Sequence, residues 1–261
     1  MLSASQLTSV LQVARDAGHA VMAVYDACSR GASPEVSRKA DDSPVTEADM
    51  DSHRIIVAGL AALDEALPVV SEEDTDSHAH RTRKGRYWLV DPLDGTKEFL
   101  DRNGEFTVNI ALIDNGTAVA GVVVAPALGL EYWGATGLGA WRDTGTGPSQ
   151  LSVCTPCAAS LPRVIASRSH LDSATQDYLR RLGPHSLVQA GSSLKFCRIA
   201  EGAADLYPRF GPTCEWDVAA AHAILEAAGG QVLCLDGTPL RYGKAGVLNP
   251  PFIASNGHVS V

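Results

Sequence analysis

The chain has 261 residues, of which 45% are hydrophobic, and a formal net charge of -9 at pH 7. This length and hydrophobic content are sufficient for a substantial core, in one large domain or two small ones. The negative charge argues against a broad nucleic-acid surface, because a polyanion would be repelled outside a local basic patch. The chain contains no run of about 18 apolar residues, the length that could span a membrane. Its first residues lack the features of a secretory signal. We therefore expect a cytoplasmic protein, and association with the inner face of the membrane stays open.

The first part of the chain predicts two helices joined by a polar segment. Apolar residues recur at helical spacing from Leu7 to Val24, which predicts an amphipathic helix that covers a sheet. Residues 29 to 42 are polar and predict a mobile, hairpin-like connection and a candidate lid. A second helix begins near Asp49 or Ser52. Its apolar stripe consists of Ile56, Leu60, Leu63 and Leu67. Asp49 can be interpreted simply as the N-cap of this helix.

A hexapeptide after the apolar run 87–90 is the most informative motif of the chain. It reads Asp91-Pro92-Leu93-Asp94-Gly95-Thr96 and predicts that a buried strand ends abruptly in a turn. The two carboxylates and the Leu93 carbonyl can face a single hard cation, with the Thr96 hydroxyl beside it. Taken alone, the motif also fits an ordinary turn with solvated aspartates.

Further acidic residues stand where other hydrophobic segments begin or end. They are Asp49, the pair Glu72 and Glu73, and Asp217. Carboxylates at the ends of elements can converge across a fold, so these residues predict a site with more than one metal ion. Oxygen ligands without a matching His or Cys set favour Mg²⁺ over zinc. Glu73 fits equally a base near the metals or a solvated neighbour.

Basic and cysteine-containing segments have simpler interpretations. The run Arg81 to Arg86 is interpreted as a solvated loop ahead of a strand. Six scattered cysteines indicate free thiols in a reducing compartment. The Cys154-x-x-Cys157 spacing lacks the second pair that a zinc site would need.

The rest of the chain predicts a hairpin and then an alternation of strands and helices. Alternating residues over 106–112 and 117–124 flank Asp114-Asn115-Gly116, which predicts an antiparallel hairpin. Shorter strands are expected at 132–133, 140–141, 164–166 and 186–188, and helices at 173–181, 195–201 and 217–228. The pattern changes between Pro148 and Pro162, where we expect a domain boundary. These patterns alone indicate only a mixture of α and β structure.

Four stretches of the chain resemble one known family, the lithium-sensitive, magnesium-dependent inositol monophosphatase superfamily. They are Val45–Asp49, Ser71–Asp74, Trp88–Thr96 and Trp216–Ala220, in the family's order and at similar spacings. The stretches 191–197 and 206–213 resemble a branch that removes one phosphate from adenosine 3′,5′-bisphosphate and leaves AMP. The resemblance implies a layered αβαβα sandwich, with an α+β part at 1–157, an α/β part at 158–261, and the metal site between two sheets.

The resemblance also implies roles for individual residues. Two or three Mg²⁺ ions are expected, one held by Glu72, Asp91, the Leu93 carbonyl and Asp94, and a second shared by Asp91, Asp94 and Asp217. Thr96 and Asp49 are expected to take a proton from the attacking water, and Glu72 to orient a further water. The substrate-binding residues are expected to be Gly95, Thr96, Ser192, Ser193, Lys195, Arg209 and Asp217.

The substrate is less firmly indicated than the metal site. A second phosphate needs a cation away from the metals, which Lys195 or Arg209 can supply. Hydrolysis of inositol monophosphate or fructose 1,6-bisphosphate is the alternative within the enzyme class. A metal-dependent binding module without catalysis is the alternative of another class. A small-molecule substrate is expected, no nucleic acid or obligatory protein partner is indicated, and the resemblance implies a role in sulfate assimilation.

Overall fold

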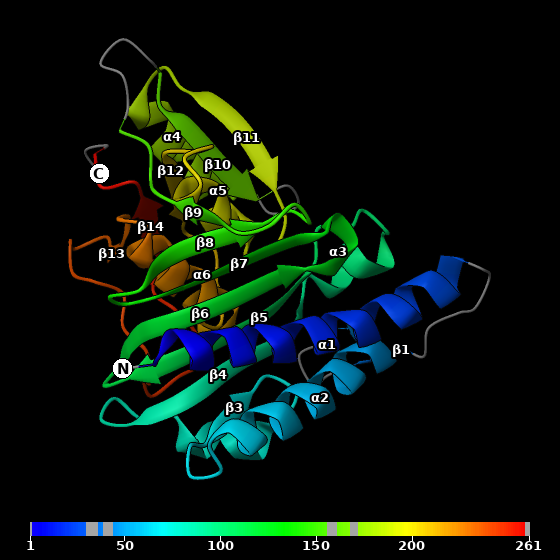
Figure 1. Ribbon diagram of the computed structural model, residues 1–261. Coiled ribbons are helices and arrows are strands. Elements are labelled where there is room, and N and C mark those ends of the chain that lie inside the picture. The colour runs from blue at the N-terminus through cyan, green and yellow to red at the C-terminus, as the bar shows by residue number, and fades with distance from the viewer. Residues whose placement is uncertain (1, 30–35, 39–43, 156–160, 168–171, 259–261) are drawn as a thin grey trace.

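The computed structural model describes residues 2–29, 36–38, 44–155, 161–167 and 172–258. Its layers follow the order helices, sheet, helices, sheet, helix (Figure 1), which confirms the predicted sandwich. The α-helices are α1 (Ala4–Ser29), α2 (Glu47–Leu63), α3 (Thr96–Leu100), α4 (Ser173–Leu182), α5 (Leu194–Ala200) and α6 (Glu215–Ala227). Two 3₁₀-helices are η1 (Thr75–His80) and η2 (Pro126–Leu128). Among the described residues, no helix has the length and apolar character needed to cross a membrane.

The larger sheet has seven strands in the order β3-β4-β5-β6-β7-β8-β9. Their bounds are β3 (Val69–Ser71), β4 (Arg86–Asp94), β5 (Thr107–Asp114), β6 (Thr117–Ala125), β7 (Leu130–Ala135), β8 (Gly139–Asp143) and β9 (Ser149–Leu151). Neighbouring strands are antiparallel except β3, which runs parallel to β4. The predicted hairpin is confirmed as β5 and β6. Its turn residues Asn115 and Gly116 have φ of 49° and 74°, as a two-residue hairpin turn requires.

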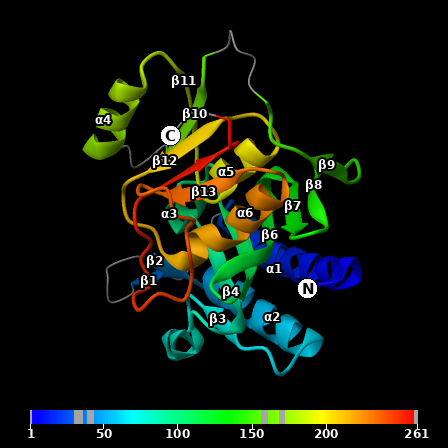
Figure 2. The same ribbon diagram turned by 90° about the vertical axis from the view of Figure 1, so that its left-hand side faces the viewer.

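The smaller sheet has five strands in the order β11-β10-β12-β14-β13. Their bounds are β10 (Arg163–Ser167), β11 (Ser186–Ala190), β12 (Leu206–Arg209), β13 (Gln231–Cys234) and β14 (Phe252–Ser255). Helices α5 and α6 lie between the two sheets (Figure 2), and α4 covers the outer face of the smaller one. The larger sheet ends at Leu151 and the smaller one begins at Arg163. The boundary between 157 and 158 lies outside the described residues, so it stays a prediction.

The segment predicted as a hairpin-like connection is described only in part. Strand β1 (Val36–Arg38) pairs with β2 (Pro44–Thr46) in an antiparallel ladder. The other residues of 30–43 lie outside the described ranges, so the candidate lid stays a prediction. The interpretation of the Cys154-x-x-Cys157 spacing also stays a prediction, because residue 157 is not described.

Helices α1 and α2 cover one face of the larger sheet. The predicted stripe of α2 is right at Ile56 and Leu60, which are fully buried, and wrong at its end, because Leu63 is 41% exposed and Leu67 lies beyond the helix. The stripe of α1 consists of Leu7, Val10, Leu11, Ala14, Ala17 and Val21, each at most 4% exposed. Helix α6 covers the opposite face. Because helices lie on both faces, β4 is buried along both of its sides from Tyr87 to Leu93. The end of β4 is therefore enclosed by protein, where charged groups are poorly screened by water.

Helix α6 can approach the larger sheet closely because residue 121 on β6 is a glycine. A Cβ atom at Gly121 would lie 2.0 Å from the backbone oxygen of Ala220 in α6. A side-chain rotation could not relieve this contact, since the obstacle is backbone. The glycine therefore fixes how near α6 lies to the strands beneath it.

We predict that Gly121→Ala lowers the free energy of unfolding by about 1–3 kcal/mol, the usual scale for overpacking. The shift should appear in urea unfolding followed by circular dichroism. Gly246→Ala is the matched control, because a Cβ there would meet no atom within 4 Å. Equal stability of the two variants would show that the close approach of α6 imposes no steric limit.

Candidate active site

The hexapeptide does not end β4 as expected, because the strand continues to Asp94 through a β-bulge. In the ladder with β5, Asp91 pairs with Asn109 and Asp94 pairs with Thr107. Three steps along β4 thus match two steps along β5. In a regular strand, residues three apart point to opposite faces. The extra residue of the bulge brings both aspartates to the same face. The Asp-x-x-Asp spacing can therefore direct two carboxylates to one site.

Glu72 reaches the same place through the parallel pairing of β3 with β4. Ser71 pairs with Val90, and Glu72 N donates to Val90 O at 3.1 Å. Continued by one residue, this register places Glu72 beside Asp91. The neighbouring Glu73 is half-buried, and its N–H reaches Ser71 Oγ at 3.4 Å; its role stays open.

Asp217 joins the site from the first turn of α6. Its Oδ2 accepts a hydrogen bond from Cys214 N at 2.9 Å, which fixes the carboxylate at the start of the helix. One ligand oxygen each of Glu72, Asp91 and Asp217 can be chosen so that all lie within 4.8 Å of one another. The structure therefore brings three of the predicted metal ligands together.

Electrostatics indicates that this cluster suits a cation. Burial raises the pKa of Asp94 to about 6, and the nearby Glu72 adds to the shift. Burial and the charges of Asp94 and Glu72 also raise the pKa of Asp217 well above its ordinary value. Like charges in a desolvated place disfavour ionisation, and a bound cation removes that penalty. Oxygen-only donors suit a hard metal ion.

Asp49 and Thr96, the predicted proton-transfer pair, lie in contact. Thr96 Oγ1 donates to Asp49 Oδ1 at 3.4 Å. Asp49 Oδ2 accepts from both the N–H and the hydroxyl of Thr46, each at 2.7 Å. The N-cap of α2 is therefore Thr46, whereas Asp49 occupies the third helical position. The reading of Asp49 as the N-cap is wrong, since its side chain bonds back to the residue that caps the helix.

The turn after β4 depends on Gly95. This residue has φ of 92°, and a Cβ there would lie 2.3 Å from Ser192 Oγ. Ser192 Oγ can donate to Asp94 O at 2.9 Å or to Glu105 O at 2.7 Å. The serine hydroxyl thus ties the turn to the segment ahead of α5.

Ser193 and Asn109 connect the two halves of the site. Ser193 Oγ donates to Asp217 O at 2.6 Å and accepts from Asn109 Nδ2 at 3.0 Å. The same amide lies 3.4 Å from Asp94 Oδ2. Sequence reasoning did not single out Asn109. Its place opposite Asp91 follows from strand pairing, which no local motif reveals.

A pocket of about 170 Å³ opens beside the acidic cluster. Its lining residues include Asp94, Gly95, Ser192, Lys195, Arg209 and Asp217, together with Glu98, Tyr207 and Thr213, which the sequence analysis did not select. Lys195 is 6% exposed and its Nζ donates to Ser192 O at 2.6 Å. Burial lowers the pKa of Lys195 to about 8, although Asp94 opposes the shift. Arg209 donates to the carbonyls of Gly211 and Pro212. The pocket therefore combines an acidic end with two basic side chains.

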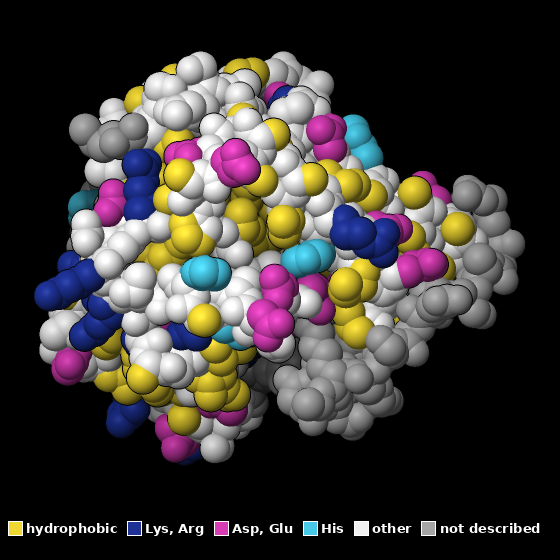
Figure 3. Space-filling view, turned by 90° about the horizontal axis from the view of Figure 1, so that it is seen from below, with side chains coloured by type: hydrophobic (Ala, Val, Ile, Leu, Met, Phe, Trp, Pro, Cys, Tyr) yellow, Lys and Arg dark blue, Asp and Glu magenta, His cyan; other side chains and the backbone are white. Residues whose placement is uncertain are grey.

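The segment that carries Glu72 is fixed by two histidines. His53 Nδ1 and Ser71 Oγ share a hydrogen bond of 2.8 Å, and His78 Nε2 lies 3.0 Å from Ser71 O. The His78 ring also lies 4.9 Å from that of Trp216 in α6. In the view from below, acidic and histidine side chains gather near the centre of the face (Figure 3).

The basic run before β4 is solvated only in part. Arg83, Lys84 and Arg86 are exposed, as expected. Arg81 is different, because its side chain is 5% exposed and forms an ion pair with Glu215. The interpretation of the whole run as a solvated loop is therefore wrong at Arg81, whose partner lies far along the chain.

The layered sandwich places an acidic cluster beside a pocket with two basic side chains, an arrangement that suits an enzyme acting on phosphate esters. The chain belongs to the inositol monophosphatase family, whose pattern matches residues 4–258. It is 52% identical over 248 residues to the 3′(2′),5′-bisphosphate nucleotidase CysQ of Salmonella typhimurium, covering 94% of this chain and 98% of the relative. A CysQ of Escherichia coli O157:H7 is 51% identical, with 95% and 99% covered. The crystal structure of CysQ from Bacteroides thetaiotaomicron superposes with a TM-score of 0.84 at 39% identity, covering 97% of both chains. The chain is thus a phosphatase of this family.

We predict that Asp217→Asn stabilises the cation-free protein and weakens its response to divalent cations. The raised pKa of Asp217 means that its charge costs stability above the pKa of the unfolded chain. Asparagine removes that charge and keeps an acceptor for Cys214 N. A cation at about 100 times its dissociation constant should stabilise the wild type by about 2.7 kcal/mol.

Thermal unfolding with and without MgCl₂ checks both parts of this prediction. Asp177→Asn, at an exposed position in α4, is the control that should keep the wild-type response. A full response to the cation in Asp217→Asn would remove Asp217 from the proposed ligands.

Proposed function

We propose that this chain is a Mg²⁺-dependent 3′(2′),5′-bisphosphate nucleotidase that hydrolyses adenosine 3′,5′-bisphosphate to AMP and phosphate. One observation carries the proposal, the convergence of Glu72, Asp91 and Asp217 beside a pocket that contains Lys195 and Arg209. The names of the CysQ relatives support the substrate. This substrate is formed when sulfate is activated and reduced, which would place the enzyme in sulfate assimilation in the cytoplasm.

The acidic cluster is the proposed Mg²⁺ site. Glu72, Asp91, the Leu93 carbonyl and Asp94 would hold one ion, and Asp91, Asp94 and Asp217 would share another. Bound Mg²⁺ neutralises phosphate oxygens and lowers the pKa of a bound water. The oxygen-only donor set favours Mg²⁺ over softer metals.

Thr96 and Asp49 are the proposed route for the proton of the attacking water. Thr96 Oγ1 would accept that proton while it passes its own to Asp49 Oδ1, its neighbour at 3.4 Å. The two hydrogen bonds from Thr46 hold Asp49 Oδ2 and leave Oδ1 directed at Thr96. The pair is thus oriented before substrate binds, and water can attack without a phosphoenzyme.

The phosphate groups of the substrate would meet two different surroundings. Main-chain N–H groups of Gly95 and Thr96 would bind the phosphate that is cleaved. The second phosphate would bind Lys195 and Arg209, both in the pocket beside Asp94. The hydroxyls of Ser192 and Ser193 bond to main-chain carbonyls, so we propose that they shape this pocket.

Two basic residues favour a bisphosphate over inositol monophosphate. A monoester places its single phosphate at the metal site and brings no second anion to these two side chains. Fructose 1,6-bisphosphate also has a second phosphate and is therefore the closer competitor. A metal-dependent binding module would have no use for the contact between Thr96 and Asp49.

Phosphate release from adenosine 3′,5′-bisphosphate, inositol 1-phosphate and fructose 1,6-bisphosphate tests the proposal, with and without Mg²⁺. Mg²⁺-dependent release that strongly favours the adenosine compound is the expected result. Preference for a sugar or inositol phosphate would keep the metal site and overturn the substrate. No release from any compound would favour the binding module.

We predict that Thr96→Ala lowers kcat by about 10²- to 10⁴-fold, the usual contribution of a positioned acid or base. Thr96→Ser is the matched control, because it keeps the hydroxyl and should keep most of the activity. Stabilisation by Mg²⁺ should persist in both variants, since neither removes a carboxylate. Near-wild-type turnover in Thr96→Ala would refute the proposed proton route.

We predict that Lys195→Ala or Arg209→Ala lowers kcat/KM for the bisphosphate. The loss of transition-state stabilisation should be about 1.5–3 kcal/mol, the scale of a charge-assisted hydrogen bond. Activity on a monophosphate should fall far less, because only the bisphosphate has a second group to bind. Arg180→Ala, at an exposed site in α4, serves as a control. Equal losses on both substrates would contradict the selectivity role.

A further inference from the structure

The proposed metal ligands come from segments that are far apart in sequence. Glu72 follows β3, whereas Asp217 belongs to the first turn of α6. Their negative charges repel each other in a desolvated place. Contacts outside the cluster must therefore hold the two segments together when no cation is bound.

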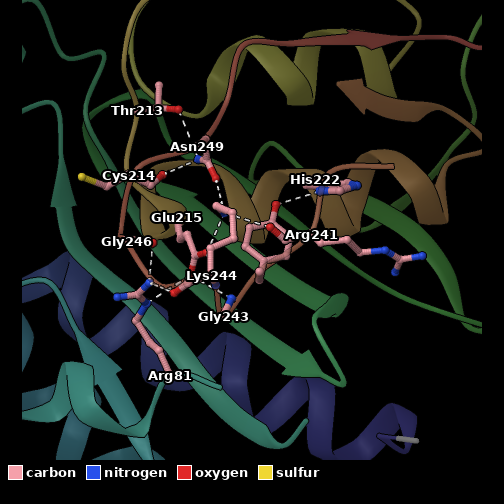
Figure 4. Close-up of polar contacts among 11 residues, drawn as sticks. Arg81, Thr213, Cys214, Glu215, His222, Arg241, Gly243, Lys244, Gly246 and Asn249 are labelled. Carbon is pink, nitrogen blue, oxygen red and sulfur yellow. Dashed lines mark hydrogen bonds and ion pairs between the residues drawn. The ribbon is translucent and has the colours of Figure 1, made fainter. Parts of the chain in front are cut away.

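Glu215, two residues before Asp217, is the centre of such contacts. The residue is fully buried. One carboxylate oxygen accepts from Arg81 Nε at 3.1 Å and Gly243 N at 3.1 Å. The other accepts from Lys244 Nζ at 2.6 Å and Lys244 N at 3.2 Å. Figure 4 shows Arg81 and Lys244 converging on this carboxylate from separate segments.

Arg81 joins this centre to the segment that carries Glu72. It follows η1 directly, and its side chain is almost fully buried. Besides its ion pair with Glu215, its Nη2 donates to Lys244 O at 2.9 Å and Gly246 O at 2.7 Å. The guanidinium therefore binds both the first turn of α6 and the loop 243–246.

Lys244 and Asn249 complete the ring of contacts around the start of α6. Lys244 Nζ also donates to Asn249 Oδ1 at 3.0 Å. Asn249 Nδ2 donates to Cys214 O at 2.8 Å, and Asn249 N donates to Thr213 O at 2.8 Å. Thr213 lines the proposed substrate pocket. The network thus surrounds the residues that lead into Asp217 (Figure 4).

We propose that Glu215 is a positioning residue that, with Arg81 and Lys244, fixes Asp217 opposite Glu72 before any cation binds. This inference rests on the metal role that the proposed function gives to Asp217 and Glu72. The ion pairs are too far inside the protein to be exchanged for water without cost. They hold the two backbone segments in place where repulsion would separate the carboxylates.

A purely structural role must be distinguished from this one, and the chain offers a matched control. Glu201 is also a carboxylate with a buried side chain that joins the two halves of the chain. It accepts from Arg142 Nη1 at 2.6 Å, Arg198 Nη1 at 2.7 Å and Tyr132 OH at 3.0 Å. These partners lie on β8, α5 and β7 and include none of the proposed metal ligands.

The test compares Glu215→Gln with Glu201→Gln in the full chain. Glutamine keeps the size of the side chain but directs an NH₂ group at donors such as Arg81 and Lys244. Mn²⁺ is the probe, and its free concentration is followed by electron paramagnetic resonance without substrate. We expect Glu215→Gln to weaken Mn²⁺ binding by about tenfold or more, the scale for groups that orient metal ligands. Glu201→Gln should bind Mn²⁺ as the wild type does, at a temperature where circular dichroism shows both folded.

Wild-type Mn²⁺ affinity in Glu215→Gln, with a melting temperature lowered as in Glu201→Gln, would overturn the proposal. If Glu215→Gln does not fold, Arg81→Gln breaks the same connection and leaves Glu215 paired with Lys244. Weakened Mn²⁺ binding in Arg81→Gln would then support the proposal, and wild-type Mn²⁺ affinity would overturn it. A wild type that binds no Mn²⁺ would refute the metal site itself. Mn²⁺ binding without hydrolysis of the bisphosphate would refute only the proposed substrate.

Discussion

Repulsion among closely spaced carboxylates is the constraint on which the rest of this structure depends. Glu72, Asp91 and Asp217 bring ligand oxygens within 4.8 Å of one another, and Asp94 adds to the same field. Each carboxylate is fixed by a different device: a parallel strand register, a bulge in β4, and the first turn of α6. Because the backbone keeps the ligands together, ordering them would reduce the binding free energy of a cation only slightly.

The opposite charges in the pocket follow from the same arrangement. Lys195 lies in α5 and Arg209 at the end of β12, so both come from the part of the chain that forms the smaller sheet. The bulged strand that carries Asp91 and Asp94 belongs to the larger one. A ligand between them meets carboxylates on one side and cations on the other. The pocket therefore has a local polarity that the net charge of -9 does not reveal.

The sequence predicts elements that are encoded locally and the acidic residues at their ends, and the resemblance assigns these residues their roles. The stripe of α1 and the alternation of β5 and β6 were sufficient, because helix and strand periods appear within a few residues. The bulge in β4 was not predicted, because a bulge is defined by the pairing of two strands and β4 pairs with β5. Arg81 was misread for a similar reason, because its partner Glu215 belongs to α6. Thr46 escaped attention because several polar residues near the start of α2 could cap it.

The place of β14 has a consequence for how the protein is made. Residues 252–255 form a strand between β12 and β13, antiparallel to both. During synthesis β12 and β13 emerge first and have no direct pairing with each other. The smaller sheet therefore cannot close until the ribosome has passed residue 255, and the loop that holds Arg81 is completed only shortly before. Until then, the early segments expose apolar surface that the finished sheet buries.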